Sequence, residues 1–221
     1  MYFLGVSTCK KKDTIFVILK KSLKNVKKHY CLKEIRMYNK NVTDKDIEQK
    51  IVEFYNDSKY IISKRIFNQN GRPPKNVKAH PKIIVNFTDK QTQHIERIRN
   101  NKIPVEGFSL SQKKAWEKEY CGIGLGNNYF VPLYDLISCL LGLYEQKRFI
   151  IEKSVSYYND LTIELDRLKT KSIKGQNRFK NFQPDKIYDI MLILSTVLWF
   201  REKIPYKSKY ITGSRGHMTH V

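Results

Sequence analysis

The sequence is short of acidic residues. Asp and Glu number 21 against 42 Lys and Arg, which gives the 221-residue chain a formal net charge of +21. A field of this sign attracts polyanions, and neutralising phosphates releases their counterions. We therefore expect a nucleic-acid partner. The alternatives are ribosome association, binding to a membrane surface, or the lysine bias of an AT-rich genome, which also favours Asn, Tyr and Ile.

The chain has no cysteine pair with C-x-x-C spacing. Its four cysteines are scattered, and no nearby pair of histidines completes a zinc pattern. Such cysteines are typical of reduced, mostly buried thiols in an intracellular protein. They are Cys9, Cys31, Cys121 and Cys139.

Long apolar stretches are also missing. The longest run, from Ile190 to Phe200, is about half of a membrane span and is interrupted by Ser195 and Thr196. The short apolar start of the chain is soon followed by lysines, unlike a signal peptide. We expect a soluble protein that does not enter a membrane.

Nucleotide-binding and nucleophile motifs are absent as well. Residues 122–126 read GIGLG, but they follow no clear strand and lack a GK[ST] sequence, so we reject a phosphate-binding loop. The chain has no Walker A motif, and the positions suggest no Ser-His-Asp or Cys-His arrangement.

Apolar patterning predicts an α/β domain. Runs of β-branched and apolar residues predict strands, and apolar residues at helical spacing predict helices. The predicted strands are 2–6, 14–19, 30–37, 82–87, 103–110, 128–131 and 149–151. The predicted helices are 44–55, capped by Thr43, then 90–100, 132–146, opened by Pro132, 156–169 and 185–203. Loops are predicted at 68–81, 113–126 and 171–182.

The order of these elements favours one architecture. The first two strands can form a hairpin, and the strand–helix–strand unit of residues 82–110 implies parallel pairing. A hairpin-led strand set followed by strand–helix units is how ribonuclease H-like domains begin. We expect a mixed central sheet flanked by helices over residues 1–206, followed by a basic, flexible tail at 207–221.

Three segments of the second half carry a resemblance. Residues 128–137 read NYFVPLYDLI, residues 146–151 read QKRFII, and residues 187–192 read IYDIML. They resemble the C-terminal nuclease domain of phage terminase large subunits, whose patterns are "W-x-V-P-K-R-D-L-V", "G-R-L-K-I" and "H-D-D-L-V-x-A-x-A-L-A". The leucine-rich helix of that family is matched by residues 157–169.

The first half agrees with the family in outline. Residues 5–9 read GVSTC and residues 13–15 read DTI, where the family has "G-V-D-x-G-x-x-x-D-x-T-A". Residues 84–89 read IVNFTD, where the family has "V-V-D-A-T-G". The resemblance spans nearly the whole chain as a pattern.

The acidic positions depart from the family. Its nucleases hold two divalent metals, Mg²⁺ or Mn²⁺, with a cluster of carboxylates. Here Ser7, Asn86 and Tyr188 occupy expected acidic positions, and only Asp189 matches. Asp185 lies one turn earlier on the same helical face. Because neutral groups cannot offset two divalent charges about 4 Å apart, the resemblance implies weak metal binding and lost or weakened cleavage.

Other acids are candidate substitutes. If the site is active, Asp185, Asp189 and Glu106 are the expected metal ligands, with Asp189 and Asp185 catalytic. Glu106 has a second interpretation as a solvated charge at a strand end, and Asp185 as a helix N-cap. Asp13 lies near a family Asp position, but capping of a turn explains it.

Basic residues are candidate DNA contacts. Residues 70–75 read NGRPPK, and a Gly-Arg-Pro core can lie in the minor groove, although a basic loop explains it as well. Lysines around Trp116 suit phosphate contact and base stacking, unless Trp116 is a partly buried anchor. The candidates are Arg72, Lys75, Lys113, Lys114, Lys118, Lys174 and Arg178.

Three functions follow from these observations. The preferred one is a terminase-nuclease-like protein that binds double-stranded DNA during viral DNA packaging, in the cytoplasm of an infected host. The alternatives are an active two-metal endonuclease that cuts viral DNA, and a basic RNA-binding protein. The resemblance also implies packaging partners, an ATPase subunit and a portal, because a complete terminase large subunit carries its Walker A motif ahead of this domain.

Overall fold

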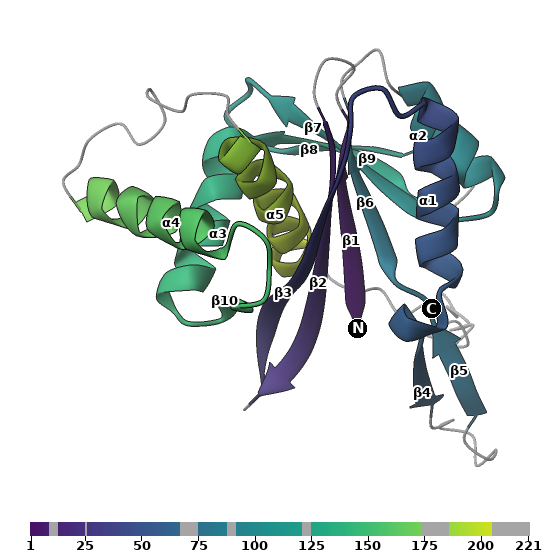
Figure 1. Cartoon of the computed structure of the whole chain (residues 1–221), viewed down its shortest axis with the longest axis horizontal. Helices are drawn as coiled ribbons and strands as arrows, with labels where there is room; N and C mark the ends of the chain where they lie inside the picture. Colours follow the sequence, from purple (N-terminus) through teal and green to yellow (C-terminus); the bar gives the residue numbers. More distant parts are fainter. Residues whose placement is uncertain are drawn as a thin grey trace, which may run out of the picture.

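The protein is built around one large sheet with helices on both faces (Figure 1). The computed structural model describes residues 1–8, 13–24, 26–66, 75–87, 92–120, 125–173 and 186–204. Eight strands form the sheet in the order β10-β3-β2-β1-β6-β7-β9-β8, and β4 and β5 form a separate pair. The predicted α/β class, with a mixed central sheet flanked by helices, is confirmed.

The elements follow the predicted order closely. The strands are β1 (Tyr2–Ser7), β2 (Thr14–Lys24), β3 (Lys27–Tyr38), β4 (Ile62–Ile66), β5 (Lys75–Ala79), β6 (Lys82–Asn86), β7 (Val105–Ser111), β8 (Glu117–Tyr120), β9 (Asn127–Pro132) and β10 (Phe149–Ile151). The helices are α1 (Asp44–Asn56), the 3₁₀ helix η1 (Ser58–Tyr60), α2 (Thr92–Asn100), α3 (Leu133–Glu145), α4 (Tyr158–Ile173) and α5 (Lys186–Lys203).

Strand directions divide the sheet into two parts. Strands β1, β2 and β3 form an antiparallel meander, so the predicted hairpin is confirmed. Strands β6, β7 and β9 add beside β1 in parallel, as the strand–helix–strand unit predicted. The short β8 closes one edge antiparallel to β9, and β10 closes the other parallel to β3.

Thr43 caps α1 as predicted. Its side chain accepts a hydrogen bond from the backbone N–H of Asp46, while the Asp46 carboxylate accepts one from the backbone N–H of Thr43. This reciprocal capping box satisfies donors that the first helical turn leaves unpaired. It fixes the point at which the chain leaves the meander and crosses toward β6.

Four predictions about local structure were wrong. The predicted loop at 68–81 contains β5, and the predicted irregular stretch at 113–126 contains β8. Helix α4 continues to Ile173, beyond the predicted start of a basic link at residue 171. Pro132 is the N-cap of α3 rather than its first helical residue, and it ends β9. The tail at 207–221 lies outside the described residues.

Two apolar cores lie on the two faces of the sheet. Helices α1 and α2 pack over one face, against β1, β2, β6 and β7. Helices α3, α4 and α5 pack over the other, and α5 is buried along most of its length. None of the described helices is long and apolar enough to cross a membrane.

Gly5 allows α5 to approach β1 closely. A Cβ at this position would lie 2.6 Å from a methyl carbon of Val197 and 2.9 Å from Cγ1 of Ile193. Further along the same helix, the guanidinium of Arg201 lies 5.0 Å from the ring centroid of Phe3. Helix α5 therefore runs antiparallel to β1, with its first turn near the carboxyl end of the strand.

Candidate functional site

The strand order reverses between β1 and β6. From β1 the chain builds the sheet in one direction through β2 and β3, and it then crosses back to place β6 on the other side of β1. In open α/β sheets, ligands bind outside the carboxyl ends of strands at such a switch point. The carboxyl ends of β1 and β6 are therefore the first place to look for a site.

Polar side chains occupy this point. Ser7 is the last residue of β1, Asn86 is the last residue of β6, and the two are paired in the parallel register. The Thr8 hydroxyl donates a hydrogen bond to the backbone carbonyl of Asn86 at 3.2 Å. From α5, the Thr196 hydroxyl lies 3.4 Å from Oδ1 of Asn86. Three segments far apart in sequence thus meet through hydroxyl and amide groups.

The first turn of α5 carries the predicted acid. Asp189 precedes Thr196 by seven residues, which is about two helical turns, so both lie on nearly the same face of the helix. Tyr188 lies in the same turn. Lys186, at the start of α5, forms an ion pair of 3.3 Å with Asp13 beside the start of β2. This ion pair gives Asp13 a structural role beyond the predicted turn.

Glu106 lies away from Asn86. Its neighbour on β6 is Ile84, whereas Asn86 is level with Phe108. The Glu106 carboxylate accepts a hydrogen bond of 2.9 Å from the backbone N–H of Asn127, at the start of β9. We assign Glu106 to holding β9 in place, and its role as a metal ligand stays a prediction.

A hollow of about 760 Å³ opens at the carboxyl ends of β1, β6 and β7. Ser7, Thr8 and Asn86 form one part of its wall, and Lys113 and Glu117 form another. Lys113 donates to the Glu117 carboxylate at 2.7 Å, so its charge is partly compensated. The remaining lining residues are Phe87, Phe108, Ser109, Leu110, Ser111, Gln112, Phe130 and Leu192.

The predicted DNA contacts are divided between regions. Lys113 and Lys114 lie in the exposed turn between β7 and β8, and the ammonium of Lys118 lies 4.1 Å from the ring centroid of Tyr120 on β8. Lys75 begins β5, in the pair that Figure 1 shows below α1, at the end of the sheet where β1 begins. Arg72, Lys174, Arg178 and the candidate ligand Asp185 lie outside the described residues.

Comparison of the chain with protein-family models, curated proteins and solved structures finds no match. Within the described residues, no three His, Cys, Asp or Glu side chains gather as a metal site.

The residue that sequence reasoning missed is Thr196, which is buried and contacts Asn86. The sequence feature that could have identified Thr196 is the pair of hydroxyl residues, Ser195 and Thr196, that interrupts the longest apolar run.

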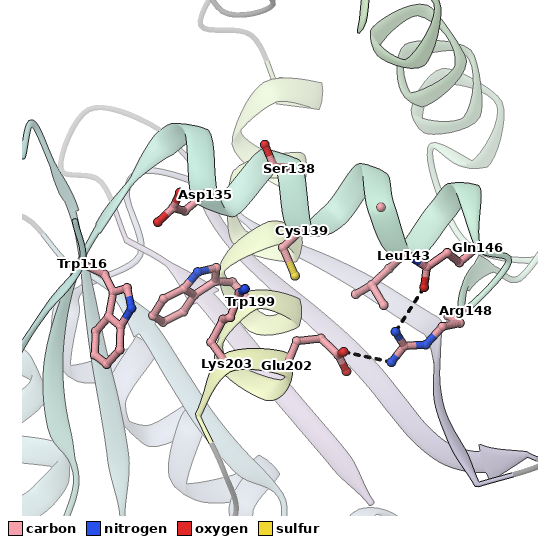
Figure 2. A pocket seen from close by; sticks show the side chains of 11 residues that line it. Trp116, Asp135, Ser138, Cys139, Leu143, Gln146, Arg148, Trp199, Glu202 and Lys203 are labelled. Carbon is pink, nitrogen blue, oxygen red and sulfur yellow. Dashed lines mark hydrogen bonds and ion pairs between the residues drawn. The ribbon is translucent and has the colours of Figure 1, made fainter. Parts of the chain in front are cut away.

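A second hollow, of about 420 Å³, lies between α3 and α5 (Figure 2). Trp116 lines it at one end, with its ring centroid 5.5 Å from that of Trp199, and is 42% exposed. Trp116 thus contacts the buried Trp199 while much of its own ring stays exposed, and base stacking by Trp116 stays a prediction. Cys139 points into the hollow from α3 (Figure 2). Burial raises the pKa of the Cys139 thiol to about 12, so it stays protonated at neutral pH and is a poor nucleophile.

Glu202 is the centre of a polar network at the other end of this hollow. Its carboxylate accepts hydrogen bonds from the Tyr30 hydroxyl at 2.6 Å and from Arg148 at 2.9 Å, the latter drawn in Figure 2. Burial raises the pKa of Glu202, but these hydrogen bonds and the charges of Lys28 and Arg148 outweigh it and hold the pKa below its usual 4.5. The network joins the end of α5 to β3 and to Arg148, directly before β10.

This shifted pKa predicts a pH dependence of stability. A carboxyl whose pKa is lowered by folding stabilises the folded state above pH 4.5, and this stabilisation is lost as the pH falls through the folded-state pKa. We expect Glu202→Gln to lower the melting temperature at pH 7. Between about pH 5 and pH 3 the melting temperature of this variant should fall less steeply than that of wild type. Thermal denaturation across this range, with exposed Glu145→Gln as control, checks it. Parallel curves for wild type and Glu202→Gln would contradict the assignment.

Proposed function

We propose that this chain is a terminase-nuclease-like protein with a ribonuclease H-like fold, which binds double-stranded DNA in viral DNA packaging and has lost or weakened cleavage. Two features of the sheet support the fold assignment. A three-stranded antiparallel meander comes first, and parallel strands then add beside β1. This is the arrangement expected of a ribonuclease H-like domain.

One observation carries the proposal. The resemblance assigns acidic positions to residues 7, 86 and 188–189, which are far apart in sequence. Ser7 and Asn86 are paired neighbours on β1 and β6, and α5 runs with its first turn toward the same end of the sheet. An accidental resemblance gives no reason for these positions to converge, and still less for them to converge at the switch point of the sheet.

The chemistry of the converging groups favours binding over cleavage. A two-metal nuclease must neutralise two divalent cations and the phosphodiester that they hold. The hydroxyls of Ser7 and Thr196 and the amide of Asn86 are neutral, and they supply hydrogen bonds but no charge. Ser7 and Asn86, which line the hollow, can still contact phosphate oxygens, as hydroxyl and amide side chains do in protein–DNA interfaces. The net charge of +21 supplies the long-range attraction.

A plasmid assay tests this function. We expect wild-type protein to bind supercoiled plasmid in a salt-sensitive way and to leave it uncut in the presence of Mn²⁺. With several phosphate contacts, binding is expected to weaken by about three to five orders of magnitude between 50 and 200 mM salt. Gel mobility at stepped salt concentrations reports binding, and conversion to open circles reports nicking.

The controls separate the alternatives. Asp189→Ala and a chelator accompany the Mn²⁺ reactions. Nicking that needs Mn²⁺ and disappears in Asp189→Ala would establish the active two-metal endonuclease instead. Binding that strongly prefers an RNA duplex over the same DNA sequence would favour the RNA-binding alternative. Binding to neither would overturn a nucleic-acid function.

A further inference from the structure

The hairpin of β2 and β3 extends beyond its neighbours at the end of the sheet opposite the candidate site (Figure 1). The pairing of β2 with β1 extends only as far as Lys20, which lies opposite Tyr2. Strand β10 pairs with β3 only from Tyr30 to Leu32. Beyond these residues β2 and β3 pair only with each other, in the pairs Ser22–His29, Leu23–Lys28 and Lys24–Lys27. We call residues 20–29, apart from Asn25, the basic ribbon.

The charge of the basic ribbon is of one sign. Five of its residues are lysines, and no acid occurs in the sequence between Asp13 and Glu34. Lys24 lies directly opposite Lys27, and like charges in this position destabilise a hairpin. Neither Lys24 nor Lys27 forms an ion pair with any described residue, whereas Lys28 lies 3.7 Å from Glu202. A bound polyanion would neutralise Lys24 and Lys27 and so remove the repulsion between them.

The tip of the basic ribbon is apolar and strained. Leu23 is 70% exposed and Val26 is 96% exposed, so neither contributes to a core. Val26 has a φ of 64°, in the left-handed region that a β-branched residue rarely adopts. Glycine would occupy this position without strain. Folding of the hairpin alone therefore does not explain a valine here.

We propose that the basic ribbon is a second DNA-binding element, which lies in the major groove of duplex DNA. The major groove of B-DNA is about 12 Å wide and admits a two-stranded β-ribbon. In this position Lys24 and Lys27 contact phosphates, and Leu23 and Val26 contact base edges, where thymine methyl groups offer apolar surface. The inference rests on the proposed DNA partner but not on the site at the carboxyl ends of β1 and β6.

Two variants test the basic ribbon, with a control of equal charge. Lys24→Gln/Lys27→Gln is compared with Lys153→Gln/Lys169→Gln, whose lysines are exposed just after β10 and on α4. The ribbon variant is expected to reduce the slope of log affinity against log salt by about two and to bind a DNA duplex about tenfold more weakly than the control. Val26→Gly is expected to raise the melting temperature and yet weaken DNA binding, so unfolding cannot account for its loss.

The outcomes separate this inference from the proposed function. Equal slopes and affinities for the ribbon and control variants would overturn the inference while leaving DNA binding intact. Failure of wild type to bind DNA would overturn both. Because the major groove of A-form RNA is deep and narrow, the effect of Lys24→Gln/Lys27→Gln should disappear on an RNA duplex. An equal effect on RNA would overturn placement in the major groove.

Discussion

The double variant Ser7→Asp/Asn86→Asp is expected to bind Mn²⁺ and to nick supercoiled plasmid in its presence. Because Ser7 and Asn86 are paired at the ends of β1 and β6, the two new carboxylates would lie side by side at the switch point. Thr196, 3.4 Å from the Asn86 amide oxygen, can donate to the carboxylate that replaces it. Asp189 would add a third acid from the first turn of α5.

The expected effect on stability is large and changes sign with metal. Without metal the two carboxylates repel each other and lower stability. At a Mn²⁺ concentration about 100 times the dissociation constant, binding adds about 2.7 kcal/mol. For a protein of this size that corresponds to a rise of roughly 5–10 °C in melting temperature. Thermal denaturation with and without Mn²⁺ measures this, and the plasmid assay measures nicking.

A matched variant makes the test specific. Ser109→Asp/Ser111→Asp adds the same charge to the same hollow but on β7, one strand further from β1. It should gain much less from Mn²⁺ and should not nick plasmid. If both double variants respond equally, the effect is general charge attraction. If neither responds, the positions that the resemblance points to do not form a metal site.

The sequence predicted the elements that have a core to pack against. Residues 82–87 are nearly continuous apolar sequence, and residues 82–86 form the central strand β6, buried on both faces. By contrast β8, whose sequence is EKEY, is an exposed edge strand without an apolar pattern. Strands β4 and β5 pair only with each other, outside the large sheet, so their sequences carry no periodic pattern of apolar residues. An exposed strand forms because another strand pairs with it. The periodicity of apolar residues does not show which segment that partner is.

The site was predictable in part, for a physical reason. Ser7 and Asn86 end strands, and ends of parallel neighbours meet, so their proximity followed once β1 and β6 were adjacent. The contact between Thr196 and Asn86 depends on how α5 crosses β1, which apolar periodicity does not determine. Asp13 was expected to cap a turn. Its ion pair with Lys186, at the start of α5, also depends on how α5 crosses β1. The position of α5 thus decides what the site contains.

Gly5→Ala is expected to destabilise the protein by about 3 kcal/mol, at the upper end for an overpacked core. The added Cβ would meet Val197 at 2.6 Å, Val17 at 2.8 Å and Ile193 at 2.9 Å, all below normal contact. Each of these side chains is β-branched and fully buried, so none can turn aside freely. Helix α5 must therefore move away from β1, and the melting temperature should fall by roughly 6–12 °C.

Gly142→Ala is the matched control, because nothing lies within 4 Å of a Cβ at that position in α3. It should stabilise the protein by roughly 0.5–1 kcal/mol, since alanine loses less backbone entropy in a helix than glycine. Because α5 carries Thr196 and Asp189, the shift in Gly5→Ala should also weaken metal binding by a Ser7→Asp/Asn86→Asp background. The basic ribbon, at the far end of β2 and β3, should keep its DNA contacts. Equal melting temperatures for Gly5→Ala and wild type would mean that α5 is not seated on Gly5, and the contact between Thr196 and Asn86 would lose its basis.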